Sequence, residues 1–124
     1  MKFSQVLGLN HVKHHLTSSA DAGRVPHAQL FVGPEGCGTL PMAIAYAQYM
    51  LCKNTGGENE GGIADCNKKC EHLNHPDLHF AFPVATSDTV SSHPVSDHYR
   101  AAWSVFISEQ PYGNLFDWYR EIGI

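Results

Sequence analysis

The sequence contains no apolar run approaching the roughly 18–20 residues that a membrane-spanning helix requires, so we expect no membrane contact. It also lacks an excess of positive charge, with a formal net charge of −4. Strong, autonomous nucleic-acid binding depends on a basic surface and is therefore not expected. The N-terminal residues MKFSQVLGLNHVKHHL lack the apolar core of a secretory signal. Together these absences predict a cytoplasmic protein.

No C-x-x-C step occurs among the four cysteines, which are Cys37, Cys52, Cys66 and Cys70. The absence of that step argues against a dithiol redox pair. Disulfides are also rare in a reducing cytoplasm. We therefore expect these cysteines to be free thiols or metal ligands rather than disulfide partners.

Residues 33–40, GPEGCGTL, lack two residues of the phosphate-binding loop that they otherwise match. In the pattern G-x-x-x-x-G-K-[ST], the lysine neutralises the β and γ phosphates and the hydroxyl group holds Mg²⁺. Thr39 replaces that lysine here, and Leu40 replaces the hydroxyl residue. The candidate site is a degenerate loop made of Gly33, Pro34, Glu35, Gly36, Cys37, Gly38, Thr39 and Leu40.

The two replacements decide what this loop can do. Backbone N–H groups and a helix N-terminus can still cradle a phosphate. A leucine side chain cannot ligate Mg²⁺, which takes oxygen ligands, and a threonine carries no charge. We predict no ATP hydrolysis by the loop and at most weak binding, so ATP is not an expected cofactor. The alternative is an ordinary strand-to-helix turn, where glycine, proline and a capping threonine are common.

Hydrophobic periodicity predicts two helices and a strand in the first half of the chain. A helix is expected over residues 10–22 with Asn10 as its cap. The apolar run at residues 28–32 indicates a buried strand. A helix over residues 40–52, capped by Thr39, follows the glycine loop.

The second half of the chain predicts one more strand and an aromatic helical pair. Residues 53–65 contain four glycines and indicate a surface loop. Residues 78–82 suit a strand, and residues 95–122 predict two helices capped by Ser96 and Asn114. Two strands make only a thin α/β layer. We therefore expect the N-terminal portion of a longer protein.

Several stretches, in chain order, resemble the N-terminal part of the delta-prime subunit of bacterial DNA polymerase III, a clamp-loader subunit. They are FSQVLGLNHVKHHL at residues 3–16, GRVPHAQLFVGPEGCGTLPMAIAYAQYMLC at residues 23–52 and HPDLHFAFP at residues 75–83. The segment PVSDHYRAAWSVFISEQPYGNLFDWYREIGI at residues 94–124 looks most like the versions found in Bacteroidetes-type bacteria.

The resemblance implies an α/β P-loop fold of the AAA+ type, with helices around a small parallel sheet and residues 1–124 as its N-terminal portion. It implies a non-hydrolysing stator subunit of the clamp loader, which loads the sliding clamp onto primed DNA. The implied partners are the delta subunit and the tau/gamma-type ATPases, with DNA and the clamp reached through the complex. The Walker B acidic segment and the arginine offered to a neighbouring ATP would lie beyond residue 124. The chain would then be part of a DNA-directed DNA polymerase assembly without catalysing a reaction itself.

The family also implies a small zinc module within residues 53–74. Cys52, Cys66 and Cys70 are three candidate ligands, and His72 or His75 is the fourth, because structural zinc takes four thiolate or imidazole ligands. The spacing departs from the family pattern, and free thiols beside surface histidines are the alternative. No side chain is assigned a catalytic role. Two competing functions remain open, a P-loop ATPase with an atypical loop and a zinc-binding interaction module.

Overall fold

The computed structural model describes residues 1–53 and 60–124, and only the backbone of residues 60–64. The chain divides into two compact units, Met1–Leu78 and His79–Ile124. Each unit has its own helices and its own packed side chains. No helix in the described part of the chain is both long enough and apolar enough to span a membrane.

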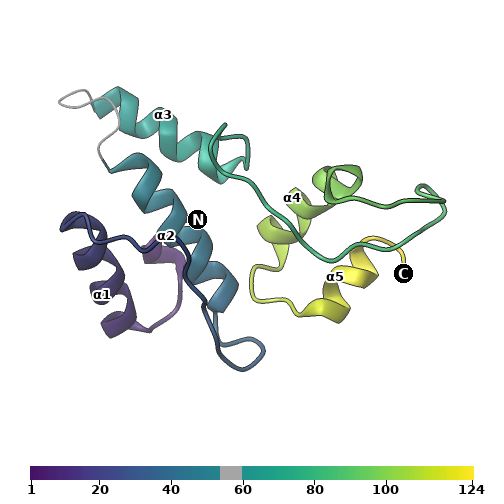
Figure 1. The fold of residues 1–124 in the computed structure, drawn as a ribbon, viewed down its shortest axis with the longest axis horizontal. Helices are drawn as coiled ribbons and strands as arrows, with labels where there is room; N and C mark the ends of the chain where they lie inside the picture. The colour runs from purple at the N-terminus through teal and green to yellow at the C-terminus, as the bar shows by residue number, and fades with distance from the viewer. Residues whose placement is uncertain (54–59) are drawn as a thin grey trace. The chain divides into compact units, whose positions relative to one another are not determined.

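The first unit is organised around one central helix (Figure 1). Its elements are the short 3-10 helix η1 (Phe3–Gln5) and the α-helices α1 (Asn10–Asp21), α2 (Thr39–Cys52) and α3 (Glu60–Glu71). η1, α1 and α3 all contact α2. The main core lies between α1, α2 and the residue that follows η1. Its buried side chains are Val6, Leu16, Ala20, Met42, Ala45 and Tyr46.

Both N-terminal helices were predicted, but their caps differ from the expectation. Leu16 and Ala20, four residues apart on α1, both face the core, in line with the hydrophobic periodicity. The N-cap of α1 is Leu9, in a left-handed conformation with φ 56°, and not Asn10. The N-cap of α2 is Gly38 rather than Thr39, which is the first helical residue. A glycine is suited to this position because its φ of 103° strains any residue with a Cβ.

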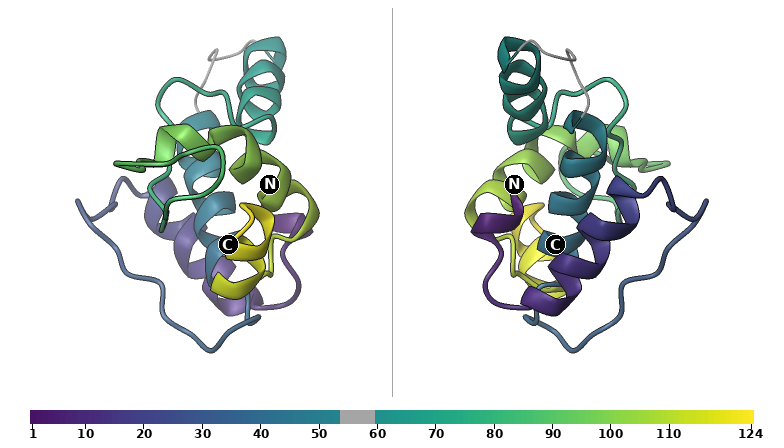
Figure 2. Two further views of the ribbon diagram at one scale, coloured as in Figure 1. Left: turned by 90° about the vertical axis from the view of Figure 1, so that its right-hand side faces the viewer. Right: turned by 90° about the vertical axis from the view of Figure 1, so that its left-hand side faces the viewer.

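The predicted α/β fold with a parallel sheet is wrong, because the described residues contain helices and no β-strand. The two expected strands, residues 28–32 and 78–82, have no strand partner. A strand exists only through backbone pairing with a neighbour, and an apolar run alone does not supply one. Residues 24–37 instead run outside the helices as a long connection (Figure 2), and Leu30 and Val32 are 86% and 79% exposed.

The predicted surface loop over residues 53–65 is wrong in its second half, where α3 begins at Glu60. Residues 54–59 of that prediction lie outside the described part of the chain. Glycine lowers helix propensity, but Gly61 and Gly62 lie in α3. Contact with α2, together with Lys68 and Lys69 in the last turn, favours the helix despite that cost.

The second unit consists of an irregular segment packed on two helices. The 3-10 helix η2 (Ser96–Tyr99) leads into α4 (Arg100–Glu109), and α5 (Leu115–Glu121) follows. Irregular residues 79–95 are tied to them by hydrogen bonds, since the Tyr99 hydroxyl donates to Ala85 O at 2.6 Å. The Trp118 indole likewise donates to Pro83 O at 2.7 Å.

Aromatic stacking forms the core of this unit. The rings of Phe82 and Trp103 are parallel with centroids 4.3 Å apart, and Trp118 meets Trp103 edge-on at 5.0 Å. Such pairs stabilise a core by about 0.5–1.5 kcal/mol beyond area burial. Of the aromatic side chains on α4 and α5, Trp103, Phe106 and Trp118 are buried in this core, whereas Phe116 is 74% exposed.

One predicted cap is confirmed and the other is wrong. Asn114 Oδ1 accepts from the Asp117 backbone N–H at 3.0 Å, and Asp117 Oδ2 accepts from the Asn114 N–H at 2.9 Å. Ser96 is not an N-cap: Val95 is the N-cap of η2 and Tyr99 that of α4, and the Ser96 hydroxyl donates to Phe82 O at 3.3 Å. The Ser96 hydroxyl thus bonds to a backbone carbonyl outside the helix instead of to the N–H groups at the helix start.

We predict that Asn114→Ala lowers the free energy of unfolding of the second unit by about 1 kcal/mol, because the cap of α5 loses its acceptor. Urea unfolding followed by tryptophan fluorescence measures this, since both tryptophans of the chain, Trp103 and Trp118, lie in this unit. Asn114→Ser keeps a capping oxygen and is the matched control. Equal unfolding midpoints for the alanine variant and the wild type would contradict the assignment.

Candidate functional site

The glycine loop is a tight turn that opens directly into α2. The Cys37 N–H donates to Pro34 O at 3.2 Å, and the Met42 N–H donates to Gly38 O at 3.0 Å. Gly36 and Gly38 have φ values of 77° and 103°, which favour glycine. The loop therefore has the backbone form of a turn that leads into a helix N-terminus.

The first glycine is required by the side chain that folds over it. A Cβ added at Gly33 would lie 2.4 Å from Cys37 Sγ and 3.2 Å from Thr39 Cγ2. The Cys37 thiol is half-buried and is not in a disulfide. Cys37 and Thr39 thus close the loop by packing on Gly33.

An apolar pocket of about 260 Å³ lies beside this loop. Its walls come from the segment before α1, from α1, from residues 30–32 and from the start of α2; they include Leu9, Val12, Phe31, Thr39 and Met42. Among the residues that the structure describes, none that lines the pocket is a lysine, an arginine or a carboxylate. It offers apolar contact next to the loop and no charge to neutralise a phosphate.

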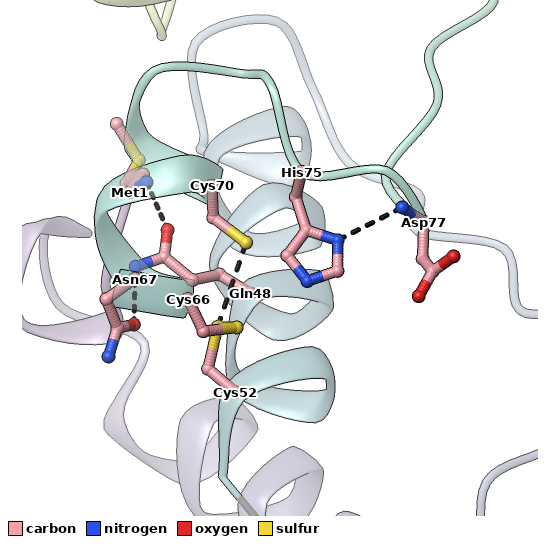
Figure 3. Close-up of a disulfide and its surroundings, with 8 residues drawn as sticks. All are labelled: Met1, Gln48, Cys52, Cys66, Asn67, Cys70, His75 and Asp77. Atoms are coloured by element: carbon pink, nitrogen blue, oxygen red, sulfur yellow. Dashed lines mark hydrogen bonds between the residues drawn. A yellow bond between two sulfur atoms is a disulfide. The ribbon is translucent and has the colours of Figure 1, made fainter. Parts of the chain in front are cut away.

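A cluster of three cysteines lies at the other end of α2. Cys52 ends α2, and Cys66 and Cys70 lie on α3. Their sulfur atoms are all within 4.8 Å of one another, and all three residues are buried (Figure 3). Leu51 and Leu78 pack against the cluster. The structure thus brings together the three cysteines that the sequence nominated as metal ligands.

The expectation that no disulfide forms is corrected by a bond between Cys52 and Cys66. Packing of α3 on α2 places their Cα atoms 5.5 Å apart, within the range that a disulfide spans. The expectation was based on the reducing cytoplasm, and that argument does not depend on how far apart the Cα atoms of Cys52 and Cys66 lie. Cys70 stays free, and its sulfur lies 3.8 Å from that of Cys52.

The surroundings of Cys70 favour its neutral thiol. Burial raises the pKa of the Cys70 thiol, the positive Met1 amine opposes that shift, and Glu71 adds to it. Burial also lowers the pKa of the Met1 amine, which donates to Gln48 Oε1 at 2.7 Å. At neutral pH, Cys70 is therefore a protonated thiol beside the disulfide.

A buried amide pair joins α2 and α3 next to the sulfurs. Gln48 is 2% exposed, and its Nε2 donates to Asn67 Oδ1 at 2.8 Å. Gln48 also accepts from the Met1 amine, so its amide is satisfied on both sides (Figure 3). Sequence reasoning missed this pair. A glutamine within the apolar run of residues 40–52 was the only signal that could have found it.

The two candidate histidines are not part of the sulfur group. His72 is exposed, and His75 is half-buried. His75 Nδ1 accepts from the Asp77 backbone N–H at 3.0 Å, so this imidazole holds the turn at His75-Pro76-Asp77. The His75 ring lies on the Cys70 side of the cluster (Figure 3), and its Nε2 is the nitrogen not used in that bond.

The donor chemistry fits a thiolate-binding metal such as zinc only when the cluster is reduced. Three sulfurs within 4.8 Å of one another are suited to sharing one ion. The disulfide uses two of these sulfurs, and a single remaining thiol cannot form a tetrahedral site. Reduced Cys52, Cys66 and Cys70 would hold the ion, with His75 Nε2, on the Cys70 side of the cluster, as a candidate for the fourth ligand.

The comparisons with known proteins first define the class. Residues 8–108, more than half of the chain, match the family model described as DNA polymerase III, delta subunit. The chain belongs to this family, and it is related to subunits of the DNA polymerase III clamp loader. No solved structure matches the chain.

Individual relatives then confirm the resemblance to the delta-prime subunit. The chain is 38% identical over 72 residues to the DNA polymerase III subunit delta' of Bacillus subtilis, covering 58% of this chain and 22% of that protein. It is also 38% identical over 63 residues to the DNA polymerase III subunit gamma/tau of Mycobacterium tuberculosis, covering 51% of this chain and 11% of that protein. The chain thus spans about a tenth to a fifth of these relatives.

Proposed function

We propose that the chain is the N-terminal part of a non-hydrolysing stator subunit of the clamp loader, which helps load the sliding clamp onto primed DNA. The observation that carries this proposal is the pair Thr39 and Leu40 in a loop whose glycines, Gly33 and Gly38, keep the spacing of a phosphate-binding loop. The loop leads into the N-terminus of α2, but it lacks the ammonium and hydroxyl groups on which phosphoryl transfer depends. Family membership supports the replication role.

A P-loop ATPase with an atypical loop is the competing function. It would require another side chain to neutralise the terminal phosphate. The pocket beside the loop is lined mainly by apolar groups, and no lysine or arginine of the described part of the chain lines it. Electrostatic stabilisation of the transition state is the largest contribution to most such reactions. The stator is therefore the function that these residues support better.

We expect the full-length protein to co-elute in size-exclusion chromatography with the delta and tau/gamma-type subunits of its own organism. We propose these partners because of the family to which the chain belongs. We propose a cytoplasmic location because these partners act in the cytoplasm. Each protein run alone is the control. If the full-length protein is well folded but elutes separately from these subunits, the proposed stator function is wrong.

The loop itself is tested by restoring what it lacks. The full-length protein should show no ATP turnover, and Thr39→Lys with Leu40→Thr should raise Mg·ATP affinity at least about tenfold. One charge-assisted hydrogen bond contributes about 1.5–3 kcal/mol, and about 1.4 kcal/mol is a factor of ten in affinity. Isothermal titration measures the affinity.

Ser18→Lys adds the same charge at an exposed position of α1 and controls for non-specific attraction. Turnover by the wild type that disappears when the loop residues are changed would support the ATPase instead. So would wild-type Mg·ATP affinity that is already high and unaffected by the double substitution.

We further propose that the reduced cysteine cluster binds one zinc ion, as a structural brace between α2 and α3. Zinc affinity of the reduced protein, measured by competition with a chromophoric chelator, should fall more than about tenfold in Cys66→Ser. Cys37→Ser removes a cysteine outside the cluster and should leave the affinity unchanged. Equal zinc affinities of the reduced wild type and Cys66→Ser would exclude this site. Whether the zinc-bound segment is also an interaction module for DNA is a separate question, which DNA-binding titrations over a range of salt concentrations would test.

A further inference from the structure

A free thiol lies in contact with the disulfide between α2 and α3. Cys70 Sγ is 3.8 Å from Cys52 Sγ, and Cys52 is already bonded to Cys66. Cys70 is 0% exposed, and Leu51 and Leu78 cover the cluster. The buried Cys70 thiol is thus shielded from reagents in solvent and lies within reach of the disulfide of its own chain.

Helix geometry places both Cys66 and Cys70 beside Cys52, as alternative partners for it. They are four residues apart on α3, so their side chains lie on one face of the helix, one above the other. That face contacts the C-terminal end of α2, where Cys52 lies. A sulfur–sulfur bond is about 2.05 Å long, so the Cys70 sulfur has to approach by about 2 Å to bond to Cys52.

We propose that Cys52 is the shared sulfur of an exchangeable disulfide, bonded to Cys66 in one isomer and to Cys70 in the other. The Cys70 thiolate attacks Cys52 Sγ, the Cys52–Cys66 bond breaks, and Cys66 leaves as a thiolate that takes up the proton Cys70 released. One disulfide and one thiol are present before and after the step. The exchange therefore needs no external oxidant or reductant.

The exchange moves the covalent link by one turn of α3. Four residues correspond to about 6 Å along the helix axis. The free thiol moves in the opposite sense, from Cys70 to Cys66. The oxidised protein is thus a pair of isomers that differ in where α3 is tied to α2, and the link to α2 always ends at Cys52.

The first test uses the oxidised chain with Cys37→Ser as the only substitution, so that the loop thiol cannot interfere. After incubation and unfolding in acid, N-ethylmaleimide labels the free thiol, and peptide mass spectrometry locates it. We expect label on both Cys66 and Cys70. Label on Cys70 alone, at every incubation time, would overturn the proposal without any variant of the cluster.

The second test removes one sulfur at a time from that background and oxidises each variant with oxidised glutathione. That reagent accepts two electrons and is reduced to two glutathione thiols. Cys66→Ser should form the Cys52–Cys70 bond, and Cys70→Ser should form the Cys52–Cys66 bond. Cys52→Ser should lose the link between α2 and α3.

Far-UV circular dichroism establishes that each variant keeps its helices. A folded Cys66→Ser variant that retains both thiols after oxidation would overturn the proposal. So would a Cys52→Ser variant that forms a Cys66–Cys70 bond as readily as the others, because Cys52 would not then be the shared sulfur.

Discussion

The packing of α2 is the constraint on which the first unit depends. η1, α1 and α3 all contact this helix. Three of its side chains lie in the core, those of Met42, Ala45 and Tyr46. The two candidate sites lie at its two ends, the glycine loop at Thr39 and the cysteine cluster at Cys52. A helix of 14 residues is about 21 Å long. Changes at one site should therefore have little direct effect on the other, because separated sites act nearly independently.

Each site uses a helix end differently. At the N-terminal end, glycines give the backbone a conformation that other residues rarely adopt, and Cys37 packs onto Gly33 where a Cβ would not fit. At the C-terminal end, the link to α3 consists of side chains: a disulfide, a free thiol and the Gln48–Asn67 amide pair. The loop is thus specified by backbone conformation, and the cluster by the distance between two helices.

Much of the fold was predictable wherever the signal was local. Hydrophobic periodicity found α1 and α2, and the Asn114 cap found the start of α5. The caps at Leu9, Gly38 and Val95 were missed, since left-handed backbone conformations at Leu9 and Gly38 and a competing hydrogen bond of Ser96 decided them. The sheet was mispredicted because residues 28–32 and 78–82 are apolar without having a backbone partner. α3 was missed because its glycines masked a helix held by packing on α2.

The sequence by itself determined the chemistry at positions 39 and 40 and the membership of the DNA polymerase III delta-subunit family. Side-chain identity needs no fold to be known, and a missing ammonium group is missing in any conformation. Only the tertiary structure decided that Cys52, Cys66 and Cys70 meet, that two of them are bonded, and that His72 stays apart. The physical reason is that a contact between sulfurs depends on how α3 lies against α2, and spacing along the chain does not specify that register.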